Sequence, residues 1–240
     1  MRVRFPLDFY DIYVIIFTLR FKEMLMDKFW RKIGRGYPGE SLGVLVFVMV
    51  GGGAAIHADN LGPVGVSLAH GLSLAFMIWA TGGGHLNPAV TLGIFFRHKI
   101  SAIKAISYIA CQLVGAILGA GFLRVLYPIS FSSATPALGP GVNVILGMVL
   151  ESIFTGVLVW VVLVTAVDRK IKWAPLMIGL TVAGVAIVLG SSTGASINLA
   201  RWFGPAIMSG STANHWAYWL SPFAGAFAGF ALSKLKVSGK

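Results

Sequence analysis

Two asparagines, Asn87 and Asn198, stand in matching glycine-containing stretches of an otherwise apolar chain. The first stretch reads GGGHLNPAV over residues 82–90, and the second reads TGASINLARWFGPA over residues 193–206. An asparagine side chain caps a helix by accepting backbone N–H hydrogen bonds, and it keeps N–H groups of its own to donate. Pro88 fits the first helical position, where its missing N–H is not needed. Each stretch therefore predicts a short helix that begins at its asparagine.

Two carboxylates, Glu40 and Glu151, are the only ones among the eight acidic residues that fall within apolar segments. Each precedes its asparagine by 47 residues. A carboxylate there can accept hydrogen bonds from loop N–H groups that would otherwise be buried without a partner. We expect this structural role for both, with Gln112 assisting. The alternative is a proton relay of the kind an active transporter needs.

The segments that position these residues are long enough to cross a bilayer. Of the 240 residues, 57% are hydrophobic and 11% are charged, whereas a soluble domain carries about 25% charged residues. A transmembrane helix needs roughly 17–25 apolar residues. The expected spans are 41–56, 64–80, 105–123, 143–167, 174–189 and 216–233. We predict an all-α membrane protein with six transmembrane helices and two re-entrant half-helices, at 88–96 and 198–208.

The two halves of the chain are related by an internal repeat. An offset of 111 residues matches Ser41 with Ser152, Gly83 with Gly194, Ala89 with Ala200, and Gly93 with Gly204. The repeats cover about 40–126 and 151–233, with three spans each. Because three is odd, the second half enters the membrane from the opposite face. The halves are therefore predicted to be inverted repeats whose functional elements meet near the midplane.

The basic residues indicate the topology and not a nucleic-acid partner. The formal net charge is +11, but seventeen of the nineteen Lys and Arg fall in four clusters that six spans place on one side. These clusters lie before Glu40 and at 97–104, 169–172 and 234–240. An excess of Lys and Arg marks cytoplasmic loops, so we expect both termini in the cytoplasm. Attraction to anionic membrane lipid is a secondary expectation.

Together these motifs resemble the aquaporin, or major intrinsic protein, family. GGHLNPAVTLG is similar to the first Asn-Pro-Ala box of the family, formed here by Asn87, Pro88 and Ala89. NLARWFGPA is similar to the second box, formed by Asn198, Leu199 and Ala200, with leucine in place of proline. The two glutamates, Gln112 and the segment HWAYWLSPFAGA also fit the family.

The resemblance covers about residues 40–233, which we take as a channel domain. A basic cytosolic arm at 1–39, whose apolar runs are too short to span, and a tail at 234–240 flank it. The resemblance implies an hourglass of six tilted helices and two half-helices, usually a homotetramer. It also implies passive passage of water or small neutral solutes, with no cofactor, no metal and no catalytic residues.

By the same resemblance, His70, Ala186, Ala195 and Arg201 form the selectivity filter. Arg201 offers donors and repels cations, since an intramembrane charge normally faces a cavity. His70 stands where strict water channels carry an aromatic residue, and in this it resembles tonoplast and ammonia-permeable members. The alternative is a histidine hydrogen-bonded between helices. His85 is expected to brace its loop.

The two asparagines are expected to aim amide N–H groups at the pore centre. A water molecule there accepts through its oxygen and turns its hydrogens away, which interrupts a chain of proton transfers. Two positive helix ends also repel cations. Leu199 adds an N–H group and a larger side chain opposite Pro88, so we predict an open but altered pore.

Water is the expected solute, and ammonia and hydrogen peroxide are further candidates. Trp202 and Ala206 replace the Asp and the basic residue that glycerol-conducting members usually carry, which favours water. The small Ala186 and Ala195 imply a wider filter, so a glycerol or urea facilitator is the alternative. A poorly conducting structural protein is a second alternative. An enzyme lacks support, because no Ser–His or paired-Asp arrangement recurs in the spans.

Overall fold

The computed structural model describes residues 36–235. Most of the predicted arm at 1–39 and of the tail at 234–240 lies outside the described residues. The regular elements of the described part are α2 (Tyr37–Ile56), α3 (Ala58–Ala80), α4 (Pro88–Phe96), α5 (Ala102–Leu126), the 3₁₀ turn η1 (Phe131–Ala134), α6 (Val144–Val162), the π-helical turn η2 (Leu163–Asp168), α7 (Ala174–Thr193), α8 (Leu199–Ser209), α9 (Trp216–Trp219) and α10 (Ser221–Lys234). The predicted all-α class is confirmed.

Five of the helical segments in the described range have the length and hydropathy to cross a membrane: α2, α3, α5, α7, and α6 with its continuation η2. The sixth predicted span, 216–233, is divided between α9 and α10. Pro222 lies in the first turn of α10, where its missing N–H interrupts the helical hydrogen bonds. Leu220 keeps helical angles (φ −85°, ψ −37°), so the chain continues across the break in nearly the same direction.

The second span is bent near its start. It begins at Ala58 and not at residue 64 as predicted, and Gly62 within it has φ 64° and ψ 171°, which are not helical. Pro63 follows, and a proline disfavours helical angles in the residue before it. Glycine adopts the required positive φ without a steric penalty. The straight part of α3 therefore starts about where the sequence predicted the span.

The two halves pack in the same way around their contact. In the first half α2 lies along α5, and in the second half α6 lies along α10. The halves meet where α3 crosses α7. Gly71 and Gly179 allow this crossing, because a Cβ atom on either would collide with the backbone of the other helix.

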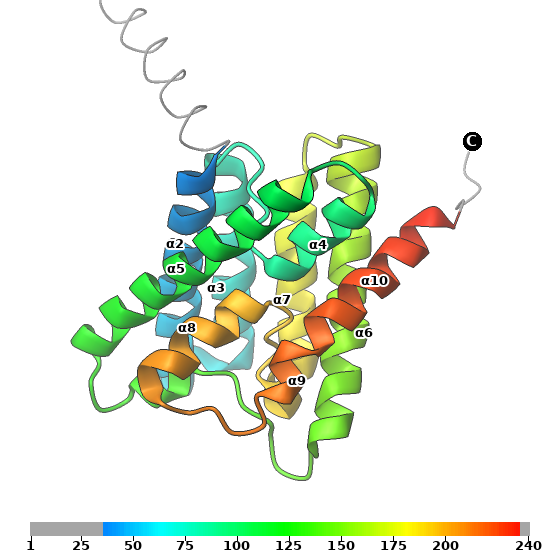
Figure 1. Cartoon of the computed structure of the whole chain (residues 1–240). Helices are drawn as coiled ribbons and strands as arrows, with labels where there is room; N and C mark the ends of the chain where they lie inside the picture. Colours follow the sequence, from blue (N-terminus) through cyan, green and yellow to red (C-terminus); the bar gives the residue numbers. More distant parts are fainter. Residues whose placement is uncertain (1–35, 236–240) are drawn as a thin grey trace, which may run out of the picture.

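The short helices α4 and α8 each pack on the other half of the molecule. Helix α4 lies against α10, and α8 lies against α5. Figure 1 shows α4 nearer the end of the bundle where α2 begins and α8 nearer the opposite end. This arrangement agrees with the predicted inverted repeat and brings the first residues of α4 and α8 together inside the molecule.

Basic loops gather at one end of the bundle. Helix α2 begins and α10 ends at this same end in Figure 1. Arg97, just after α4, forms an ion pair with Asp168 at the end of η2. The loops that carry the predicted basic clusters 97–104 and 169–172 are therefore neighbours.

Candidate functional site

The short helices α4 and α8 begin at the two asparagines. The Oδ1 atom of Asn87 accepts a hydrogen bond from the backbone N–H of Ala89 at 2.8 Å. The Oδ1 atom of Asn198 accepts from the backbone N–H groups of Ala200 at 3.0 Å and Arg201 at 3.4 Å. Both asparagines are buried. Their oxygens are thus used to cap the helices, which leaves the Nδ2 groups as the donors of the site.

These Nδ2 groups link the two loops reciprocally. Asn87 Nδ2 donates to the carbonyl oxygen of Ile197 at 2.9 Å, and Asn198 Nδ2 donates to the carbonyl oxygen of Leu86, also at 2.9 Å. Each asparagine therefore holds the residue that precedes the other asparagine. A side-chain amide has two N–H groups, so each asparagine keeps a second donor beyond this cross-link. The sequence predicted the donors, and the structure adds that one of each pair joins the half-helices.

Glu40 holds the first loop. Its Oε1 atom accepts from the backbone N–H of His85 at 2.7 Å, and its Oε2 atom accepts from that of Leu86 at 2.8 Å. Leu86 has φ 53°, a left-handed conformation that is unfavourable for a residue with a side chain. Two short bonds to one buried carboxylate offset this strain and fix the loop before Asn87.

Glu151 holds the second loop in the same manner. Its Oε1 atom accepts from the backbone N–H of Ser196 at 2.9 Å, and its Oε2 atom accepts from that of Ile197 at 2.6 Å. Ile197 has φ 41°, which is more costly still for a β-branched residue. The matching contacts show that the repeat extends to the hydrogen bonds of the loops.

The two carboxylates differ in their remaining partners. In the first half, Gln112 Nε2 donates to Glu40 Oε2 at 2.8 Å and to Thr91 Oγ1 at 2.9 Å. Thr91 Oγ1 in turn donates to the carbonyl oxygen of Asn87 at 3.1 Å and lies 3.2 Å from His85 Nδ1. The threonine thus joins the glutamine, the histidine and the asparagine. Thr91 was not among the predicted site residues.

In the second half, Thr193 takes the place of the glutamine. Its Oγ1 atom donates to Glu151 Oε1 at 2.6 Å. Its carbonyl oxygen accepts from the hydroxyl of Tyr218 at 2.8 Å. The ring of Trp202 stacks on Tyr218, with centroids 5.3 Å apart and planes 12° from parallel. Leu199 packs in the same buried cluster. The repeat could not reveal Thr193, because the offset of 111 leads from Gln112 to a phenylalanine.

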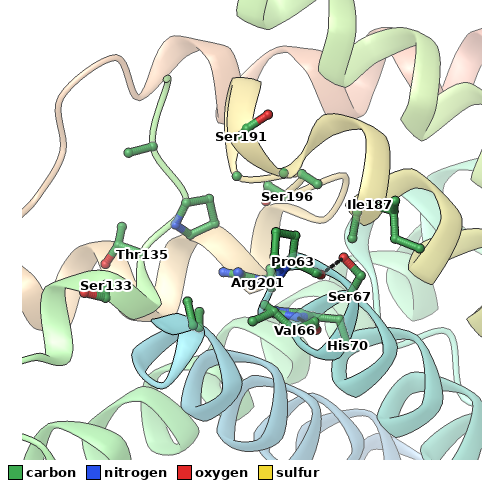
Figure 2. Close-up of a pocket in the computed structure, with 18 of the residues that line it drawn as sticks. Pro63, Val66, Ser67, His70, Ser133, Thr135, Ile187, Ser191, Ser196 and Arg201 are labelled. Carbon is green, nitrogen blue, oxygen red and sulfur yellow. Dashed lines mark hydrogen bonds between the residues drawn. The ribbon is translucent and has the colours of Figure 1, made fainter. Parts of the chain in front are cut away.

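A cavity of 660 Å³ lies beside the second loop, and all four predicted filter residues line it: His70, Ala186, Ala195 and Arg201. Figure 2 shows Arg201 and His70 in the wall of this larger cavity, with Ser133 and Thr135 contributed by the segment around η1. Arg201 is only 4% exposed. Its Nη1 atom donates to the carbonyl oxygen of Ala134 in η1 at 3.1 Å, so the connection between α5 and α6 positions the guanidinium.

A smaller cavity of 250 Å³ lies beside the first loop. Gly83, Gly84, His85 and Asn87 line one part of it, and apolar side chains from α3, α4, α6 and α7 line much of the rest. The larger cavity uses the start of α3 and the end of α7, whereas the smaller one uses the end of α3 and the start of α7. The two cavities therefore lie toward opposite ends of the bundle, and Asn87 lines the smaller one.

Comparison with known proteins identifies this arrangement. The family model for major intrinsic proteins matches residues 27–232. Probable aquaporin TIP3-2 of Arabidopsis thaliana is 40% identical over 211 residues, which are 78% of this chain and 77% of the relative. Aquaporin-4 of Mus musculus is 36% identical over 231 residues, 88% of this chain and 69% of the relative.

A solved structure supports the same assignment. The X-ray structure of the aquaglyceroporin from Plasmodium falciparum matches with a TM-score of 0.70 and 26% sequence identity, and the match covers 83% of this chain and 93% of that one. The predicted family resemblance and the aquaporin fold are confirmed. This chain is a multi-pass integral membrane protein and belongs to the major intrinsic protein family of aquaporin channels, which are not enzymes.

Proposed function

We propose that this protein is a passive channel for water that excludes protons and ions. One observation carries the proposal: the N-termini of α4 and α8 meet through Asn87 and Asn198, and the cavities beside the two loops lie toward opposite ends of the bundle. The relatives named as aquaporins agree with water as the solute. Water would pass from one cavity to the other beside the two amides.

The amides explain how water passes while protons do not. Each asparagine has one N–H left after its cross-link, and an N–H can only donate. A water molecule between them accepts through its oxygen, so its hydrogens point away along the pore. Each helix N-terminus adds roughly half a positive charge. Together these fields turn the water molecules outward from the centre and repel cations, so a continuous chain of proton transfers is broken there.

We assign solute selection to the four filter residues of the larger cavity. The buried guanidinium of Arg201 presents fixed donors to neutral solutes and repels cations. His70 supplies an imidazole wall, while Ala186 and Ala195 supply little bulk. Ammonia and hydrogen peroxide are small and uncharged like water, so we include both among the permeant molecules.

A wider facilitator for glycerol or urea is the second candidate. The two filter alanines favour it, because each contributes only a methyl group to the wall of the cavity. Trp202 favours water, because its ring is buried against Tyr218 and presents no polar group to a polyol.

Stopped-flow light scattering on vesicles that contain the purified protein separates these candidates. We expect osmotic shrinkage well above that of empty vesicles, with ammonia uptake raised and glycerol uptake raised little. Fast glycerol uptake would establish the wider facilitator. Shrinkage equal to that of empty vesicles would leave the structural alternative.

We further propose that both ends of the chain face the cytoplasm and that four copies assemble. The paired loops at Arg97 and Asp168 place the neighbouring basic residues at one end of the bundle, as expected of a cytoplasmic face. Labelling of cysteines introduced at Lys172 and at Ile129 from either side of sealed vesicles tests the orientation. The mass of the detergent-solubilised protein tests the tetramer.

A further inference from the structure

The imidazole of His70 is fixed in position on three sides. Its Nδ1 atom lies 2.9 Å from the carbonyl oxygen of Val66, one turn earlier in α3. A carbonyl oxygen only accepts, so Nδ1 carries the hydrogen of this bond. The ring of Phe47 meets the imidazole edge to face, with centroids 5.9 Å apart. Phe47 belongs to α2, and the third side of the ring faces Gly51, one turn later in the same helix.

Gly51 is the residue of α2 that lies directly against the imidazole. A Cβ atom placed on this glycine would lie 2.6 Å from His70 Nε2 and 2.9 Å from its Cγ atom, closer than real Cβ contacts. The imidazole therefore occupies the space that any side chain at residue 51 would need. Nε2 is buried and has no hydrogen-bond partner within the described part of the chain.

The ring lies between Gly51 and the larger cavity. Phe47 and Ala55, one turn before and one turn after the glycine on α2, both line that cavity, whereas Gly51 does not. His70 lines the cavity as well. The imidazole thus lies between Gly51 and the cavity. It occupies the space that a side chain at residue 51 would fill.

We infer that Gly51 is a specificity-determining residue of the channel. Because it has no side chain, the His70 imidazole can lie close to α2, and this position sets how far the ring projects into the cavity. This inference rests on the proposed function. A methyl group at residue 51 would displace the ring. Phe47 and the bond to Val66 restrict two directions, so the open direction is toward the cavity. The passage at the filter would then narrow, and larger solutes would be affected more than water.

Four variants test the inference by stopped-flow measurement: Gly51→Ala, His70→Ala, the double variant, and Gly53→Ala as a matched control. Residue 53 is on the same helix, and a Cβ atom there would meet Leu123 at an ordinary 3.5 Å. The readouts are the permeability to water and to the largest of ammonia, urea and glycerol that the unmodified channel passes.

We expect Gly51→Ala to lower the permeability to that largest solute by about tenfold, equivalent to ~1.4 kcal/mol in the barrier, and to lower water less. Gly53→Ala should match the unmodified channel. In the His70→Ala background the same substitution at residue 51 should change nothing, because the ring it would displace is gone. Equal effects in both backgrounds, or no effect in either, would overturn the inference.

Folding provides a second readout. If Gly51→Ala alone fails to fold, the double variant should fold and conduct like His70→Ala, since the clash is with the imidazole. A double variant that also fails to fold would show that the glycine acts on something other than this ring, and the inference would be wrong. If the unmodified protein conducts nothing, the proposed function falls, while the folding comparison still tests the contact between Gly51 and His70.

Discussion

The residues at the centre of the site use each polar atom for a defined partner. Asn87 and Asn198 each cap a helix with the oxygen and cross-link the opposite loop with the nitrogen. Glu40 and Glu151 use both carboxylate oxygens to hold backbone N–H groups. These contacts favour the proposed structural role for the two acids over the proton-relay alternative.

Arg201→Val should widen the range of solutes. The substitution removes the fixed donors and the positive charge from the larger cavity, and valine leaves part of the volume empty. We expect urea or glycerol uptake by vesicles to rise severalfold while water permeability is kept. Uptake rates are compared at equal protein per vesicle. Unchanged selectivity would remove Arg201 from the filter.

Mercurial reagents should inhibit the channel weakly. Cys111 is the single cysteine of the chain, is partly buried on α5, and lines neither cavity. A mercurial bound there does not enter the path of water. Osmotic shrinkage is measured before and after treatment. A strong block that Cys111→Ser abolishes would contradict this placement of the pore.

Residue identities allowed part of this site to be predicted. The asparagines, the glutamates and the four filter residues stand out because the repeat or the family motifs mark them. Thr193 and Gly51 do not stand out. The role of each arises from a contact with an element that is remote in the chain, such as the imidazole of His70 on α3, and no local spacing encodes that contact.

At the scale of elements, α4 and α8 are positioned by strained loops and by helices of the other half. Leu86 and Ile197 adopt left-handed conformations just before the half-helices. The structure has α4 at Pro88–Phe96, as predicted, and α8 at Leu199–Ser209, close to the predicted 198–208. An asparagine cap is a strong local signal for the start of both helices, and Pro88 strengthens it in α4, which explains the agreement.

The element boundaries that were missed depend on backbone detail. The bend at Gly62 lengthens the second span, Pro222 divides the last one, and α6 ends in a π-helical turn. Hydropathy shows that a segment is apolar, and it contains no information on where a helix bends or changes its hydrogen bonding. These features therefore required the structure.

Glu151→Gln should destabilise the fold. The amide replaces one acceptor oxygen with a donor that faces a backbone N–H, so a loop N–H is left without its partner. A buried unsatisfied group costs about 1–3 kcal/mol, and we expect a lower thermal unfolding temperature in detergent. Asp168→Asn is the control, because its pair with Arg97 is partly exposed and such pairs contribute about 0–1 kcal/mol.

The same variant separates a channel from a transporter. A channel with Glu151→Gln should lose stability and keep whatever passive flux its folded fraction supports. Loss of gradient-driven solute accumulation with passive flux intact would instead assign the glutamate to proton coupling.

Leu199→Pro should give a folded and conducting channel. Residue 199 is the first of α8, where proline is well tolerated. The side chain of Asn198 accepts from the N–H groups of Ala200 and Arg201, so the cap does not need an N–H at residue 199. Proline fills less of the cluster with Trp202 and Tyr218, so we expect modest destabilisation by roughly 1–2 kcal/mol. Thermal unfolding and water permeability are measured together. A closed channel would show that Leu199 itself holds the pore open.

At the scale of the whole molecule, an apolar exterior surrounds an interior that holds buried polar residues. Large apolar side chains are exposed on the spans, for example Phe76 at 60%, Val125 at 80% and Ile153 at 55%. Such a surface suits lipid or a neighbouring subunit and would be unusual in water. Several buried polar residues line the two cavities instead, among them Asn87, Ser196 and Arg201.

The most direct test combines water and proton flow in one stopped-flow experiment. Vesicles with the protein and a trapped pH indicator are exposed to an osmotic gradient and a pH gradient together. Our account predicts shrinkage much faster than in empty vesicles, with internal pH changing no faster than in empty vesicles. Shrinkage no faster than in empty vesicles, or a rapid pH change alongside it, would contradict the claim that the paired asparagines pass water and interrupt protons.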